Sequence, residues 1–190
     1  MRAAVPLLAE HGFAEFSLEE LADRAQVTRN LLYHYFPRGR PDVVAAVADR
    51  AGSDLTGDWS VDETVPLPER LAANLSRLAE HALVPSDAWR IYRHCSTASD
   101  PEVAGTVARY REIIIASISQ NHLGTPDPPP LVHLALQAYL GFAETALDEA
   151  RASGAPSEPV MRILQDTLMS VVETARSAER ESAGRTAKGP

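Results

Sequence analysis

Two short helical segments lie next to each other near the amino terminus, over residues 17 to 26 and 28 to 35. The first begins with a capping box, because the Ser17 hydroxyl can accept from the backbone N–H of Glu20 while the Glu20 carboxylate returns to the Ser17 N–H. The second begins with Thr28, a favoured N-cap residue, and a proline and a glycine soon after it prevent its continuation. We therefore expect two helices joined by a turn, which have the dimensions of a helix-turn-helix.

Helical spacing of apolar residues recurs along the rest of the chain, and no window alternates apolar and polar residues as a strand would. The chain is therefore expected to be all-α. Asp100 followed by Pro101 illustrates a helix start, since Asp caps and Pro suits the first helical position. A further helix is expected from residue 42, and others over 68–83, 87–97, 101–121, 130–152 and 158–179.

A polar stretch over residues 53 to 68, with one glycine and two prolines, separates a small first unit from a larger second one. We expect a first domain over 1–48 and a second helical domain over 49–181. Residues 182–190 are small and polar, and we expect them to form a disordered tail.

The composition excludes several classes of protein. With 45% hydrophobic and 23% charged residues, the chain resembles an ordinary soluble globular protein. Its apolar stretches fall well short of the ~20 residues that cross a bilayer, so we expect no membrane segment. The first residues lack the apolar core and the cleavage site of a secretory signal, so we expect a cytoplasmic location. The single cysteine, Cys95, excludes a disulfide framework, and the histidines lack metal-ligand spacing. Motifs of common enzymes are missing, so we expect no metal, no cofactor and no catalytic site.

Positive charge is concentrated around the second short helix, although the net charge of the chain is -8. Between Asp23 and Asp42 there are four arginines and no acidic residue, and Tyr33 and Tyr35 lie among them. Cationic side chains interleaved with aromatic ones are suited to the phosphate backbone and the grooves of DNA. This segment is therefore the candidate nucleic-acid contact of an otherwise acidic protein.

Side chains on the second short helix suit the reading of bases in the major groove. Arg29 can bond guanine, Asn30 can bond adenine, and Leu31 can contact a thymine methyl group, each worth ~1–3 kcal/mol of discrimination when well made. Thr28, Tyr33 and Tyr35 are better suited to phosphates. The plainer alternative is a solvated surface with half-buried tyrosines.

Residues 16–22 (Phe-Ser-Leu-Glu-Glu-Leu-Ala) and 27–37 (Val-Thr-Arg-Asn-Leu-Leu-Tyr-His-Tyr-Phe-Pro) resemble the DNA-binding signature of the TetR family of bacterial repressors. The resemblance covers residues 4 to 48. It implies a first helix over 4–12, a linking helix from 41, and a homodimer that binds a DNA operator and responds to a small-molecule effector. The lysine that commonly opens the linking helix corresponds to Gly39, and the flanking Arg38 and Arg40 could take its phosphate contact.

The same resemblance places an effector cavity among the helices of the second domain. Aromatic and apolar side chains on those helices are candidates to line it, although a plain core is the alternative. These candidates are Trp89, Tyr92, Tyr110, Ile114, Tyr139 and Phe142.

The last two expected helices carry broader apolar faces than one small domain can cover. We therefore expect an isologous dimer built from these helices as a four-helix bundle, with an internal core as the alternative. The residues expected at the interface are Leu134, Leu140, Leu147, Met161, Leu164, Leu168 and Val172.

Two functional hypotheses follow. The first is a ligand-responsive transcriptional repressor that binds a pseudo-palindromic operator as a dimer and releases it on binding a largely apolar effector. The second is a helical ligand-binding or interaction protein on the same scaffold that has lost DNA binding, as the acidic net charge and Gly39 suggest. Enzymatic activity is not expected.

Overall fold

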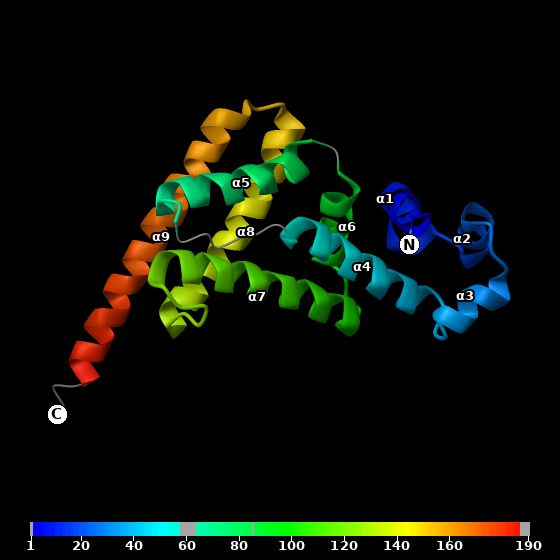
Figure 1. The fold of residues 1–190 in the computed structure, drawn as a ribbon, viewed down its shortest axis with the longest axis horizontal. Coiled ribbons are helices and arrows are strands. Elements are labelled where there is room, and N and C mark those ends of the chain that lie inside the picture. The colour runs from blue at the N-terminus through cyan, green and yellow to red at the C-terminus, as the bar shows by residue number, and fades with distance from the viewer. Residues whose placement is uncertain (1, 58–63, 85, 187–190) are drawn as a thin grey trace. The chain divides into compact units, whose positions relative to one another are not determined.

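The computed structural model describes residues 2–57, 64–84 and 86–186. Within these ranges the chain forms nine helices and no strand, which confirms the expected all-α fold (Figure 1). The helices are α1 (Ala4–Glu15), α2 (Leu18–Ala25), α3 (Arg29–Tyr35), α4 (Arg40–Thr56), α5 (Leu67–Leu83), α6 (Asp87–Cys95), α7 (Pro101–Leu123), α8 (Pro130–Ser153) and α9 (Ser157–Thr186).

The described residues fall into two compact units. One lies within Met1–Gly57 and Pro85–Tyr110, and the other within Asp58–Val84 and Arg111–Pro190. Helix α7 contributes residues to both units. The domain boundary expected between residues 48 and 49 stays a prediction, since these units are defined by packing and each draws on two separate stretches of chain.

In the first unit, α6 packs against both α1 and α4, and α2 packs against α3. Helix α1 is interrupted at Gly12, whose φ of 69° and ψ of -178° are not helical. Glycine adopts this positive φ without a side-chain clash. The largest side chains that are fully buried in this unit are Leu7, Leu8, Phe16, Val43, Val47, Trp89 and Ile91.

In the second unit, α8 and α9 form the most extensive helix pair, and α5 packs against both. Its fully buried side chains include Ile115, Leu136, Leu147, Leu164 and Leu168. Burying one such side chain contributes about 1.5–3 kcal/mol relative to leaving it exposed.

Most expected helices agree with the structure to within a few residues at each end. The largest difference is α9, which continues to Thr186, where the sequence indicates an end near residue 179. Residues 182–186 of the expected tail are therefore helical, while 187–190 lie outside the described residues. No helix in the described ranges combines the length and the hydropathy of a membrane span.

Candidate nucleic-acid interface

Helix α2 is fixed by the chemistry at its two ends. The Ser17 Oγ accepts a hydrogen bond from the Glu20 N–H at 3.0 Å, which confirms half of the expected capping box. The Glu20 carboxylate lies 3.2 Å from the Arg24 Nη2. At the other end, Gln26 adopts a left-handed backbone with φ of 54°, and its N–H bonds back to carbonyls of the last turn. This ends α2 and turns the chain toward α3.

Helix α3 begins with the expected cap, since the Thr28 Oγ1 accepts from the Leu31 N–H at 3.3 Å. Leu32 is the buried residue of this helix, and it anchors α3 to the first unit. The exposed fractions of Leu31, Tyr33 and Tyr35 are 42%, 43% and 70%. Arg29, Asn30 and His34 are also exposed.

This sorting leaves one apolar anchor facing inward and a row of cationic, amide, apolar and phenolic groups facing outward. A helix that reads DNA needs that arrangement, because only exposed side chains can reach base edges and phosphates. The contacts themselves stay predictions.

Arg29 has a partner that the sequence reasoning missed. Its Nη1 lies 2.6 Å from Glu19 Oε1 on α2, and both side chains are about half exposed. An exposed ion pair of this kind stabilises by only ~0–1 kcal/mol. Glu19 therefore restrains Arg29 only weakly.

The turn from α3 to α4 requires glycine at position 39. Gly39 has φ of 74° and ψ of -121°, which side-chain-bearing residues rarely adopt. A Cβ there would also lie 3.1 Å from the Leu18 Cδ1 and 3.4 Å from the Tyr33 ring. A lysine at this position would therefore meet both a strained backbone and a close neighbour.

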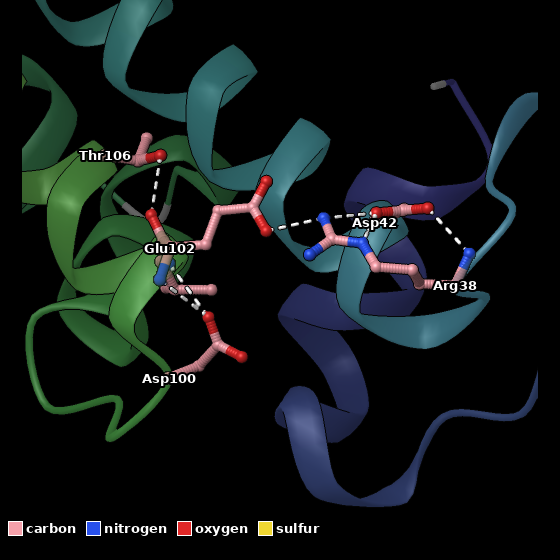
Figure 2. A network of polar contacts seen from close by, with 6 residues as sticks. Arg38, Asp42, Asp100, Glu102 and Thr106 are labelled. Atoms are coloured by element: carbon pink, nitrogen blue, oxygen red, sulfur yellow. Dashed lines mark hydrogen bonds and ion pairs between the residues drawn. The ribbon is translucent and has the colours of Figure 1, made fainter.

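The two arginines that flank Gly39 have different surroundings. The Arg40 guanidinium lies 5.0 Å from the centre of the Phe16 ring, within the range of a cation–π interaction. Arg38 points instead toward two carboxylates (Figure 2). Its Nε donates to Asp42 Oδ1 at 2.6 Å, and its Nη2 donates to Glu102 Oε2 at 2.5 Å.

Asp42 and Arg38 are joined a second time through the backbone. The Arg38 N–H donates to Asp42 Oδ2 at 2.8 Å, and this bond is the main reason why the pKa of Asp42 is lowered. The bonds to Glu102 and then to Asp42 raise the pKa of Arg38 above its ordinary value. The i,i+4 spacing of Arg38 and Asp42 could have revealed their pairing from sequence. Glu102, which is 64 positions away, carries no such signal.

Glu102 belongs to the first turn of α7, which Asp100 caps. The Asp100 Oδ1 accepts from the N–H groups of Glu102 and Val103 at 2.9 and 3.1 Å (Figure 2). This confirms the start of the helix that the sequence predicts at Pro101. Asp100 caps the helix, so the Glu102 side chain remains free to pair with Arg38.

The six candidates for an effector cavity are divided between the two units. Trp89, Tyr92 and Tyr110 are buried in the first unit. In the second unit Tyr139 and Ile114 are buried, whereas Phe142 is 41% exposed.

Hydroxyl groups of two of these tyrosines are already used in packing. The Tyr139 hydroxyl donates to the Leu164 carbonyl at 3.0 Å and so joins α8 to α9. The Tyr110 hydroxyl donates to the Asp49 carbonyl at 2.8 Å. Their assignment to an effector site stays a prediction.

Five of the residues expected at the dimer interface are buried within the chain itself, which fits the alternative of an internal core. These are Leu140, Leu147, Leu164, Leu168 and Val172. Met161 is half-buried, and Leu134 is 65% exposed.

The outward side of α8 and α9 carries a largely apolar groove of about 580 Å³. Leu131, Leu134 and Phe142 contribute its exposed large side chains. The periodicity of the sequence predicted that these helices are apolar. Most of the residues that it indicated for the dimer interface, however, lie on the faces where α8 and α9 pack against each other.

Comparison with known proteins agrees with this geometry. A model of the bacterial regulatory proteins of the tetR family matches residues 1–47. No curated protein is similar enough in sequence to be counted as a relative.

Solved structures share the fold of the chain. A tetR-family transcriptional regulator from Streptomyces coelicolor is 20% identical, with a TM-score of 0.75 over 96% of this chain and 82% of that one. A TetR-like transcriptional regulator from Rhodococcus sp. RHA1 is 20% identical, with a TM-score of 0.66 over 88% and 90% of the two chains. TetR-Q116A from Acinetobacter baumannii AYE, in complex with minocycline, is 22% identical, with a TM-score of 0.56 over 93% and 94%.

Proposed function

We propose that this chain is a regulator of the tetR family, because residues 1–47 match the model of that family and the fold is that of solved tetR-family regulators. We propose further that it is a repressor that binds a pseudo-palindromic operator as a homodimer. In this proposal it acts in the cytoplasm by binding alone, without a catalytic step. A small, largely apolar effector releases the operator by favouring a conformation that fits DNA less well.

The outward sorting of α3 is the observation that carries the proposal. Leu32 alone anchors the helix, while Arg29, Asn30 and Leu31 are exposed on its first turn. We assign the reading of bases to these three residues, because the amino-terminal part of a recognition helix contacts base edges.

We assign the contacts to phosphate to residues that lie around the three base-contacting residues. The Thr28 hydroxyl accepts a bond from the helix backbone and still has its own hydrogen to donate to a phosphate. The phenols of Tyr33 and Tyr35 are exposed. Arg38 and Arg40 complete the set, on either side of Gly39.

The homodimer is proposed to form through the outward groove of α8 and α9. In an isologous interface the same patch meets itself, so two copies of the groove would cover Leu131, Leu134 and Phe142 together. Such a dimer is expected to place its recognition helices about one DNA turn apart, at ~34–36 Å.

A salt titration tests DNA binding directly. The DNA upstream of the chain's own gene is the first probe, with a scrambled duplex of equal length as the control. We expect affinity to fall steeply as salt rises, and a preference of at least ~10³ for the specific site. Weak binding without preference between the duplexes would contradict the proposal.

Two substitutions on α3 separate base reading from phosphate contact. Arg29→Ala is expected to relax the preference between operator sequences, because it removes a base contact. Tyr33→Phe is expected to weaken binding to all sequences alike. If neither variant changes operator affinity, the assignment of α3 as the reading helix is wrong.

A ligand-binding or interaction protein without DNA binding is the second candidate. The pairing of Arg29 with Glu19, and of Arg38 with Asp42 and Glu102, favours it, because each acid reduces the cationic character of this surface. Absence of any site preference in the salt titration would support this candidate.

A further inference from the structure

Arg38 is shared between two carboxylates from different helices. Asp42 lies in the first turn of α4 and binds both the Nε and the backbone N–H of Arg38. Glu102 lies in the first turn of α7 and binds the Nη2 of the same guanidinium. Figure 2 shows the guanidinium group extended from the α3–α4 turn between these two acids.

Asp42 and Glu102 are not equivalent partners. The Asp42 side chain is only 15% exposed and holds the backbone of the turn as well as the side chain, so it is part of the local structure. Glu102 contacts only the end of the guanidinium, and its side chain is about half exposed. A guanidinium has five N–H donors, so Arg38 can release Glu102 and keep its bonds to Asp42.

The net charge of Arg38 and its two partners is unfavourable for binding a DNA phosphate. One guanidinium faces two carboxylates, so the group of Arg38, Asp42 and Glu102 has a net charge of -1. A phosphate that approaches Arg38 meets the exposed negative charge of Glu102. An exposed ion pair is weak, so a phosphate in the right place can displace Glu102.

We propose that Glu102 competes with an operator phosphate for Arg38 and thereby lowers the DNA affinity of this protein. This inference rests on the proposed function. In the free protein Arg38 is bound to Glu102 and Asp42, and on DNA it keeps Asp42 and exchanges Glu102 for a phosphate. Asp42 lies in the first turn of α4 and Glu102 in the first turn of α7. The exchange therefore makes DNA affinity depend on the distance between the first turns of these two helices.

The test compares Glu102→Gln with Glu173→Gln. Both variants change the net charge by the same amount, but Glu173 is an exposed residue of α9 in the second unit. We expect Glu102→Gln to bind the operator about 3- to 10-fold more tightly at ~0.1 M salt, because no carboxylate then has to be displaced from Arg38 before the phosphate binds. Glu173→Gln is expected to change affinity less than about 2-fold.

The variant Arg38→Gln shows whether the increase in operator affinity of Glu102→Gln depends on the Arg38 guanidinium. The double variant Arg38→Gln with Glu102→Gln should bind like Arg38→Gln alone, because there is no cation left to release. A gain of equal size in both backgrounds would overturn the proposal, since it would reflect only the loss of a negative charge near DNA. Equal affinities of Glu102→Gln and Glu173→Gln, or weaker binding by Glu102→Gln, would overturn it too.

Hydrogen exchange in the absence of DNA provides an independent readout. The backbone amides of residues 38, 39, 40 and 42 should exchange faster in Glu102→Gln than in the unmodified protein or in Glu173→Gln, because one restraint on Arg38 is lost. Unchanged exchange would contradict the pairing. If the unmodified protein shows no operator preference, the proposed function fails and the competition fails with it. If it binds its operator and Glu102→Gln gains nothing, only the competition fails.

Discussion

The ring of Tyr110 lies directly against the backbone of Gly52, where a methyl group on the glycine would overlap the ring carbons. The Tyr110 hydroxyl also lies 2.8 Å from the Asp49 carbonyl oxygen and 2.9 Å from the Asp49 Oδ1, which share its single hydrogen. These contacts hold α7 close to α4 within the first unit. The close approach depends on the missing side chain of Gly52.

Substitution of this glycine should therefore destabilise the protein. Gly52→Ala is expected to lower the free energy of unfolding by about 1–3 kcal/mol, because the Tyr110 ring must move away from Asp49. Gly105→Ala is the control, since Gly105 lies in α7 with open space around its Cβ position. It should stabilise by up to ~1 kcal/mol through helix propensity. Urea unfolding of both variants measures the difference, and equal effects would contradict the close contact.

Substitution of Gly39 should also destabilise the protein, but for a different reason. Gly39→Ala is expected to cost ~1–3 kcal/mol, because its backbone conformation is strained for any side chain and Leu18 lies close by. Gly154→Ala serves as the comparison, since Gly154 has φ of 67° but nothing near its Cβ position. Thermal unfolding should show the larger loss for Gly39→Ala. The reverse order would mean that contact with Leu18 does not matter.

Cys95 should react only when the protein unfolds. Burial raises the pKa of the Cys95 thiol to about 12. At pH 8 only about one thiol in ten thousand is then ionised, and the thiolate is the nucleophile. Labelling with a thiol reagent at pH 8 should be slow in the folded protein and fast in denaturant. Fast labelling without denaturant would show that this part of the first unit opens readily.

His122 should make stability depend on pH in the mildly acidic range. Burial lowers the pKa of His122, and the positive charges of Arg176 and Arg70 lower it further. The unfolded chain therefore binds the proton more readily, so the contribution of His122 is complete above the ordinary pKa near 6.5 and is lost as the pH falls through the lower folded value.

The variant His122→Gln isolates this effect from the titration of carboxylates. Urea unfolding at pH 7.5 and pH 5 should show a larger loss of stability for the unmodified protein than for His122→Gln. Identical losses would mean that His122 is charged in the folded state.

The outward groove of α8 and α9 should control the oligomeric state. Leu134→Asp is expected to convert the proposed dimer into a monomer, because it places a charge in the apolar groove through which the dimer is proposed to form. Ile163→Asp is the matched control, since Ile163 is a similarly exposed residue of α9 outside the groove. Sedimentation at several concentrations measures both variants. A dimer that persists with Asp at position 134 would place the interface elsewhere.

Local chemistry made the helix-turn-helix predictable. The hydroxyls of Ser17 and Thr28 cap α2 and α3 as their positions in the sequence indicate. The inward role of Leu32 and the exposure of Leu31 and Tyr35 also follow from helical spacing. Each of these features depends on residues fewer than five positions apart, so a single sequence contains enough information.

Long-range partners were not predictable in this way. The pairing of Arg38 with Glu102 joins residues 64 positions apart, and nothing in either local segment indicates the other. The partners of the apolar residues on α8 and α9 were also not predictable from the sequence. Both sides of these helices are apolar, so periodicity does not decide whether Leu140 and Leu168 pack within the chain or between copies.

The conformation of Gly39 limits which residues the turn between α3 and α4 can accept. A lysine at that position would bring a strained backbone and crowd Leu18 before it brought any cation to a phosphate. Substitutions that make this turn more positively charged are therefore expected at the neighbours of Gly39 or at the acids that pair with Arg38, and not at Gly39 itself.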